Sequence, residues 1–248
     1  MKTRPITDLF DARSASIEPH ETLRDYHYRR IDRINDGEFD VEEDQQGIIL
    51  THVASVDSLG PYLADRIDVE WFFENVKKIP LIKRSSYSDF NGRFDLCARG
   101  VKATKHSNDG TVAYTWVDRT GVLESITTDL IYEKKNEEMT ITTETLERSL
   151  TNLITWYLEY VHESDDDPVF ITISYLNMDG INTSRIGRGF GSVREIETSF
   201  IETPIVPVSE GNVREQLTPL LRPFWQEVNY TKSPYMTENG WKFNEDND

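Results

Sequence analysis

Two strand-like segments, residues 112–118 and 122–128, lie so close together that they constrain the fold more than any other feature of the sequence. Residues 118–121 link them, and Gly121 can supply the left-handed conformation that a tight hairpin turn requires. A connection this short forces its two strands to be antiparallel neighbours. With a further strand predicted at 93–98, the segment is expected to form an antiparallel meander.

Helix-length patterns alternate with these strands. Residues 144–162 carry one apolar stripe at helical spacing: Leu146, Leu150, Leu153, Ile154, Tyr157, Leu158 and Val161. Thr143 is expected to cap this helix, and Glu144 and Glu147 suit the positive end of its dipole. An earlier helix is expected at 22–35, stopped by Gly37. A last helix is expected at 213–228, kinked or segmented by Pro219 and Pro223.

Three more strands are predicted, at 47–53, 169–176 and 195–201. Strands and helices that alternate around an antiparallel meander indicate the α+β class, with an antiparallel or mixed sheet flanked by helices. We expect a flexible arm at 1–20, a single domain over 21–235 and an acidic tail at 236–248.

The chain has 44 acidic and 27 basic residues and a formal net charge of −17. Such a field opposes non-specific binding to nucleic acid. Because the acids are dispersed and arginine outnumbers lysine, we favour adaptation to a salty cytoplasm over recognition of a basic partner or mimicry of nucleic acid. No signal peptide or membrane-spanning run is apparent, and the single cysteine, Cys97, excludes an internal disulfide. These features predict a cytoplasmic protein without membrane contact.

A glycine- and arginine-bearing loop at 185–194 is the strongest candidate binding site in the sequence. Gly189 would let the backbone approach a phosphate, and Arg185, Arg188 and Arg194 would supply positive charge. The loop leads towards a strand and lacks the ending of a phosphate-binding loop, so an ordinary surface loop is the competing interpretation.

Other chemistry-bearing residues form weaker patterns. Glu133 and Lys135, with Asp118 upstream, match the residues of a magnesium-dependent nuclease, and the acidic run at 165–167 could attract a hard cation. Surface loops produce both patterns by chance. His52 and Cys97 lie in apolar strands and are interpreted as a hydrogen-bonded structural histidine and a buried inert thiol. We therefore predict no metal, no cofactor and no catalytic residue.

The order of several segments resembles one known region. The matching segments are 29–38, 47–53, 91–95, 116–126, 142–160, 168–171 and 204–228. Together they resemble the C-terminal region that follows the Schlafen-type Alba-like nucleic-acid-binding domain in prokaryotic proteins. That domain has no counterpart in this chain, so the resemblance implies a standalone relative or a split partner, and it informs fold more than function.

We therefore expect a non-catalytic interaction or regulatory module of a larger prokaryotic assembly, with a protein partner. Defence and nucleic-acid-processing systems are implied by the resemblance alone. Aromatic residues near the C-terminus would suit a docking surface, although core packing explains them equally well: Trp225, Tyr230, Tyr235 and Trp241. The alternative is a nucleic-acid-binding or metal-dependent nuclease component that uses the loop at 185–194.

Overall fold

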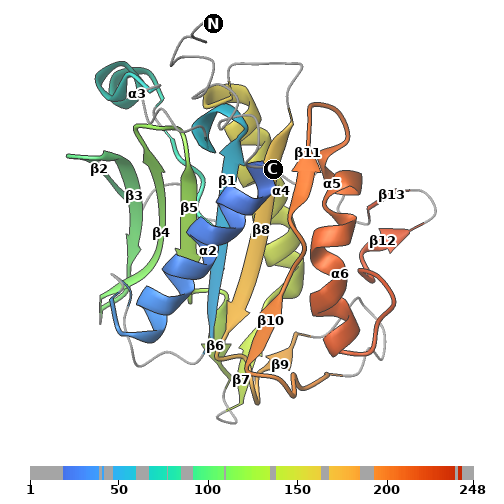
Figure 1. Cartoon of the computed structure of the whole chain (residues 1–248). Coiled ribbons are helices and arrows are strands. Elements are labelled where there is room, and N and C mark those ends of the chain that lie inside the picture. Colours follow the sequence, from blue (N-terminus) through green and yellow to red (C-terminus); the bar gives the residue numbers. More distant parts are fainter. Residues whose placement is uncertain are drawn as a thin grey trace, which may run out of the picture.

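The computed structural model describes residues 19–38, 41, 47–59, 67–76, 78–84, 92–108, 110–134, 138–162, 168–184, 193–237 and 240–241. Within these residues the chain forms a single α+β domain, which confirms the predicted fold class. Figure 1 shows a twisted sheet with α2 (Pro19–Asn35) across its front and α4 (Thr143–Tyr160) behind it.

The main sheet has eight strands in the order β10-β8-β1-β5-β4-β3-β2, and β11 also pairs with β8. All of its pairings are antiparallel. Its strands are β1 (Ile48–Ser55), β2 (Gly92–Cys97), β3 (Gly100–His106), β4 (Thr111–Asp118), β5 (Leu123–Thr127), β8 (Val169–Leu176), β10 (Phe200–Glu202) and β11 (Val206–Val208).

Two smaller sheets complete the strands. One contains β6 (Ile131–Glu133), β7 (Met139–Ile141) and β9 (Asn182–Thr183), and β7 pairs with β9 in parallel. The other pairs β12 (Met236–Thr237) with β13 (Gly240–Trp241), inside the segment predicted as a tail. At the other end, Pro19 and His20 belong to α2 although they were assigned to the arm.

Strand β1 lies at the centre of the molecule, and every one of its residues is buried. Alternate side chains point to opposite faces of a sheet. Ile49 and Val53 accordingly join the large core formed with α4, whereas Leu50 packs with Ile31 of α2 in a smaller core on the opposite face. Both layers of the fold are therefore held to the same strand.

Most predicted elements are present, with shifts of up to three residues at their ends. The meander contains a further strand, β3, that was not predicted from the sequence, because Lys102 and Lys105 interrupt its apolar pattern. The predicted strand at 195–201 is wrong over most of its length. Only β10 is a strand there, and Glu195 makes an isolated bridge with Asn182.

The remaining helices are short. They are a 3₁₀ turn, η1 (Asp57–Leu59), and the helices α3 (Val69–Asn75), α5 (Val213–Gln216) and α6 (Thr218–Glu227). The predicted last helix is thus segmented, with proline at the start of α6 and Pro223 inside it. Helix α4 is capped by Thr142, not by Thr143 as predicted, and without a side-chain bond. Among the described residues no helix is long and apolar enough to span a membrane.

The sheet is closely packed at Gly100, the first residue of β3. A Cβ at Gly100 would lie 2.0 Å from the carbonyl oxygen of Val117, a backbone atom of β4. Gly100→Ala is therefore expected to lower the free energy of unfolding by about 2–3 kcal/mol, because the strands must separate. Urea unfolding measures the loss.

Gly180→Ala is the matched control, since its φ is +78° and no atom lies within 4 Å of the added Cβ. It is expected to cost about 1 kcal/mol from backbone strain alone. Equal losses in the two variants would contradict the steric account of Gly100.

Candidate functional site

Six polar side chains meet between α2 and the sheet, and we call this group the α2 cluster. It consists of His27 and Arg30 from α2, His52 from β1, Tyr114 from β4, Glu124 from β5 and Ser174 from β8. The register of the sheet brings them together, because His52 lies directly opposite Glu124. The same register places Ser174 opposite Leu50, two residues along β1.

Glu124 is the centre of the α2 cluster. Its Oε2 accepts from Nε of Arg30 at 2.9 Å and lies 3.1 Å from Nε2 of His52. Its Oε1 accepts from the hydroxyl of Tyr114, whose oxygen in turn accepts from Nη2 of Arg30 at 2.8 Å. Both carboxylate oxygens of a side chain with 2% exposure are thus satisfied.

Burial alone would raise the pKa of Glu124, because it disfavours the charged form. The hydrogen bond and charge of His52, the charge of Arg30 and the hydrogen bond from Tyr114 outweigh burial and lower this pKa to about 2. Glu124 is therefore ionised at neutral pH. For His27, burial and the neighbouring His52 lower the pKa to about 2, so its imidazole is neutral.

The ionised carboxylate orients the first imidazole of the chain. Because Glu124 can only accept, Nε2 of His52 donates to it. Nδ1 of His52 and Nδ1 of His27 lie 2.6 Å apart and share a hydrogen bond. Nε2 of His27 is hydrogen-bonded to the hydroxyl of Ser174 at 2.8 Å. An unbroken chain of hydrogen bonds runs from Ser174 to Glu124.

A serine hydrogen-bonded to a histidine, in a chain that ends at a carboxylate, has the composition of a nucleophile with its base. Here the base, His27, is carried by the helix that covers Ser174, and Ser174 and His52 have 0% exposure. Moving α2 aside to admit a substrate would remove the base from the serine. The geometry therefore assigns the α2 cluster to holding α2 on the sheet.

A second buried carboxylate lies on the opposite face of the sheet. Glu147 of α4 has 1% exposure and accepts from Nε1 of Trp225 at 2.6 Å and from Oγ of Ser233 at 2.9 Å. Burial raises its pKa to about 7, and the two hydrogen bonds oppose that shift only in part. The sequence analysis assigned Glu147 to the helix dipole, whereas its carboxylate connects α4 to the C-terminal segment.

Of the loop residues predicted to bind anions, only Arg194 lies in the described part of the chain. Arg185, Arg188 and Gly189 lie outside the described residues. Arg194 is exposed. Its backbone N–H donates to the hydroxyl of Thr183, and its carbonyl accepts from the backbone N–H of Thr183. Its chain neighbour Glu195 is exposed as well, which weakens the positive charge that Arg194 presents.

The nuclease-like residues do not come together. Asp118 accepts from Thr120 and Val122 and so stabilises the turn between β4 and β5. Glu133 is in β6, beyond the other end of β5. Lys135 and the acidic run at 165–167 lie outside the described residues, and no three carboxylate, histidine or cysteine side chains within those residues could hold a metal.

The two residues interpreted as structural, His52 and Cys97, differ in burial. His52 is fully buried and hydrogen-bonded, as predicted. Cys97 is half-buried instead of buried, because it lies on edge strand β2, and its thiol donates to the carbonyl of Gly100 at 3.1 Å. In the described part of the chain, the thiol of Cys97 contacts no group that would activate it as a nucleophile.

The aromatic residues expected near the C-terminus are mostly core residues. Trp225 is 1% exposed and Tyr235 is 5% exposed, and their rings lie 5.9 Å apart. Tyr230 is half-buried against Trp225, and the side chain of Trp241 is outside the described set. Trp225 and Tyr235 are therefore core residues and cannot contribute to a docking surface.

Exposed aromatic residues lie elsewhere. Trp71 of α3 is 56% exposed, Phe73 of α3 is 38% exposed and Tyr160 at the end of α4 is 45% exposed. Phe72 connects the two helices, because its ring lies 5.8 Å from that of Trp156. Trp156 in turn lies 6.0 Å from Tyr160. We call the three exposed residues, Trp71, Phe73 and Tyr160, the α3–α4 aromatic surface.

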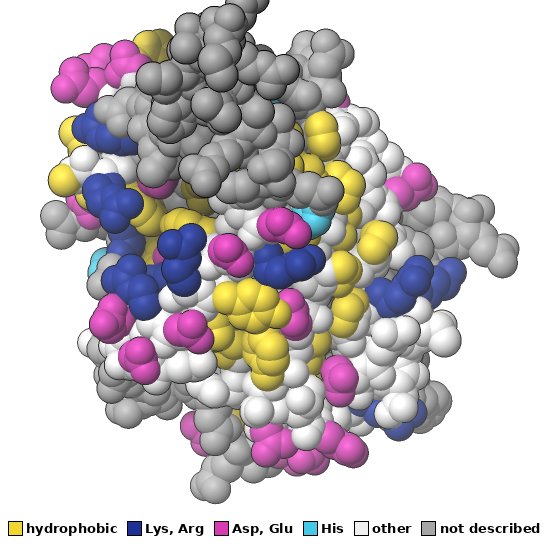
Figure 2. Space-filling view, in the orientation of Figure 1, with side chains coloured by type: hydrophobic (Ala, Val, Ile, Leu, Met, Phe, Trp, Pro, Cys, Tyr) yellow, Lys and Arg dark blue, Asp and Glu magenta, His cyan; other side chains and the backbone are white. Residues whose placement is uncertain are grey.

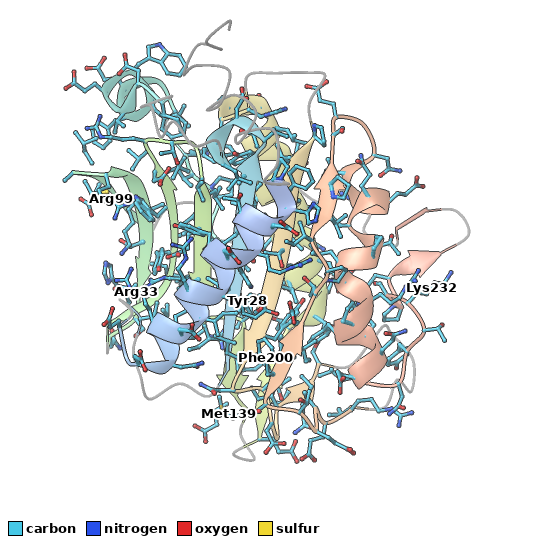
Figure 3. All side chains as sticks on the ribbon, viewed as in Figure 1. Tyr28, Arg33, Arg99, Met139, Phe200 and Lys232 are labelled. Carbon is cyan, nitrogen blue, oxygen red and sulfur yellow. The ribbon has the colours of Figure 1, made fainter. Side chains whose placement is uncertain are left out.

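The face shown in Figure 2 carries charged side chains of both signs. Acidic side chains are scattered over it, while lysine and arginine side chains gather on the side of β2, β3 and β4. Figure 3 places Arg33 and Arg99 on that side, and Tyr28 and Phe200 near the middle. Arg33 pairs with Glu38 at 2.9 Å, and Arg99 lies over the ring of Trp116.

Comparison with known proteins adds no identity: no protein-family model, no curated protein and no solved structure matches the chain.

Proposed function

We propose that the protein is a non-catalytic interaction module of a larger prokaryotic assembly, and that it docks a protein partner on the α3–α4 aromatic surface. The observation that carries this proposal is the 56% exposure of Trp71 beside an exposed Phe73. Tyr160 adds a third exposed ring, which is joined to α3 through Trp156 and Phe72.

Large aromatic side chains stabilise a protein chiefly when they are removed from water. Scattered exposed apolar residues are ordinary, but several rings on adjoining helices are typical of a surface that another molecule covers. Tryptophan and tyrosine are also the residues that most often dominate the binding energy of protein interfaces. The resemblance to a region that accompanies a nucleic-acid-binding domain supports a role as a subunit or regulatory partner.

The test is to recover the tagged full chain from its native host at native salt, beside the double variant Trp71→Ala and Tyr160→Ala. The wild type is expected to retain a stoichiometric protein partner that the double variant loses. Both changes affect exposed side chains, so thermal unfolding should show folded protein in each case.

Phe200→Ala is the matched control, because Phe200 is 40% exposed on β10, far from α3. The control is expected to retain the partner. Equal recovery with the wild type and the double variant, or loss with Phe200→Ala alone, would refute docking on the α3–α4 aromatic surface.

A second candidate function is nucleic-acid binding, the alternative raised by the sequence. Lysine and arginine side chains gather over β2–β4 in Figure 2, and two of them lie over aromatic rings, Arg99 over Trp116 and Lys102 over Tyr114. The same recovery experiment separates this candidate. Nuclease-sensitive DNA or RNA that is lost on Arg99→Ala with Lys102→Ala, or on replacing Arg185, Arg188 and Arg194, would favour it.

A further inference from the structure

Residues 229–237, which follow α6 and which we call the C-terminal segment, lie outside the main sheet. Asn229, with a φ of +62°, turns the chain at the end of α6. The strand β12 of this segment pairs with β13, and within the described residues neither of them joins another sheet. Figure 1 shows the pair on the outer side of α6. Such a segment is held in place mainly by its side chains.

The side chains that hold the C-terminal segment converge on Glu147 of α4. Oγ of Ser233 donates to Oε2 of Glu147 at 2.9 Å, and the backbone N–H of Tyr235 donates to the same Oγ at 3.2 Å. The hydroxyl of Tyr235 lies 2.8 Å from that of Thr143, the first residue of α4. The other carboxylate oxygen of Glu147 accepts from Nε1 of Trp225 at 2.6 Å. One carboxyl group therefore joins α4 to both α6 and the C-terminal segment.

The groups around Glu147 give its negative charge no counter-charge. The indole and the serine hydroxyl are neutral, and the hydroxyl can donate to a carboxylate or accept from a carboxylic acid. The charge of Glu147 acts on Tyr175 of β8 and on Tyr235, and burial raises the pKa of both phenols, to about 12 for Tyr235, so both stay neutral. The charge that shifts the pKa of Glu147, among the described residues, is that of Glu144, which has the same sign.

A buried carboxylate without a cation is strongly disfavoured. Burial accordingly raises the pKa of Glu147 from 4.5 to about 7. Lifting the C-terminal segment would admit water to the carboxylate and return its pKa towards the ordinary value. Ionisation of Glu147 and release of the segment therefore favour each other.

We infer that Glu147 is a pH-sensitive latch, whose neutral carboxyl group holds the C-terminal segment on α4 and α6 and whose ionisation releases it. This regulation is independent of the proposed docking function. Release uncovers the indole of Trp225, which is 1% exposed in the structure and packs against the ring of Tyr235. The pH thus controls access to an apolar surface.

The direction of the effect follows from the two pKa values. The segment is held most firmly below pH 4.5, and the equilibrium constant for its release rises about tenfold per pH unit until it levels off above pH 7. Between pH 6 and pH 8 this constant is expected to increase about tenfold.

Hydrogen exchange of backbone amides in the full chain, followed by mass spectrometry at pH 6 and pH 8, measures the release. The protection factor of residues 229–237, corrected for the intrinsic exchange rate at each pH, is expected to fall about tenfold. The amides of β1 should be better protected than the segment at both pH values, because they lie in the centre of the sheet and exchange only when the domain unfolds.

Three variants separate the latch from other effects of pH. Glu147→Gln keeps the shape of the side chain but cannot ionise, so the segment should be equally protected at pH 6 and pH 8. Glu159→Gln, at an exposed position near the other end of α4, is the matched control and should keep the tenfold change. Ser233→Ala removes an anchor of the segment, so it should lower protection at both pH values and keep the dependence on pH.

Trypsin provides a second measurement. Lys232 is exposed on the C-terminal segment, as Figure 3 shows, whereas the next residue, Ser233, is buried. Cleavage between them, identified by the mass of the fragment that begins at Ser233, therefore requires the segment to lift. The ratio of the cleavage rates of the wild type and Glu147→Gln cancels the pH dependence of trypsin itself, and it should rise about tenfold from pH 6 to pH 8.

Equal protection of the wild-type segment at pH 6 and pH 8, or the same tenfold loss in Glu147→Gln, would overturn the latch. Protection of the segment equal to that of β1 at both pH values would overturn it as well, because the segment would then leave α4 only when the whole domain unfolds.

Discussion

Glu124→Ala is expected to lower the free energy of unfolding by about 3–5 kcal/mol, the usual cost of removing one partner from a buried ion pair. The change would leave the largely buried guanidinium of Arg30 without its counter-charge. It would also leave the ring N–H of His52 and the hydroxyl of Tyr114 without an acceptor. Urea unfolding, with the slope m compared between variants, measures the loss.

The surface pair between Arg33 and Glu38 provides the control. Its side chains are each 61% exposed, so Glu38→Ala is expected to change stability by less than about 1 kcal/mol. A loss from Glu124→Ala no larger than that of the control would show that water reaches the α2 cluster. In that case the cluster could not be what holds α2 on the sheet.

The second large effect is on the pH dependence of stability, where two buried groups act in opposite directions. The pKa of His27 is lowered from 6.5 to about 2 in the folded protein. The unfolded chain therefore binds a proton that the folded protein excludes, and the contribution of His27 is lost as pH falls below 6.5. The free energy of unfolding changes by about 1.4 kcal/mol per pH unit in this range.

The pKa of Glu147 is raised from 4.5 to about 7 by burial, and the nearby Glu144 adds to the shift. Between these pH values the folded protein holds a proton that the unfolded chain has released. Stability is therefore fully present below pH 4.5 and is lost as pH rises through 7. From about pH 4.5 to 6.5 the slopes of Glu147 and His27 offset each other.

Glu147→Gln should reveal the pH dependence of stability that His27 contributes and that Glu147 offsets in the wild type. The amide oxygen can still accept from Trp225 and the amide nitrogen can donate to Ser233, so the hydrogen bonds persist. The wild type is expected to show a nearly constant free energy of unfolding between pH 4.5 and 6.5. The variant should lose about 1.4 kcal/mol per unit as pH falls, and above pH 7 it should be the more stable protein.

Urea titrations at a series of pH values would measure both curves. Glu159→Gln, an exposed residue near the other end of the same helix, serves as the control and should follow the wild type. Parallel curves for the wild type and Glu147→Gln would contradict a raised pKa at Glu147.

The regular elements could be predicted because their patterns are local. The hairpin at 112–128 and the helix behind the sheet follow from spacing and turn chemistry alone, and both are present within two residues of the predicted bounds. The short strand β3 was missed because Lys102 and Lys105 interrupt its apolar run. Proline signals identified the break between α5 and α6 correctly.

The α2 cluster was missed because its members are far apart in the sequence. His27 is four residues from both Leu23 and Ile31, so it occupies the buried stripe of α2. His52 occupies an otherwise apolar strand, which marks a second polar group in the core. These positions indicate burial, but only the register between β1 and β5 shows that His52 faces Glu124. Pattern alone does not supply that register.

The position of β1 has a consequence for biosynthesis. Its partner on one side, β5, begins at Leu123, and its partner on the other side, β8, begins at Val169. A ribosome adding about 5–20 residues per second takes on the order of ten seconds to proceed from β1 to β8. Until β8 has been made, at least one edge of this apolar strand lacks its partner, a state prone to aggregation. The nascent chain is therefore expected to depend on chaperones until its second half has been translated.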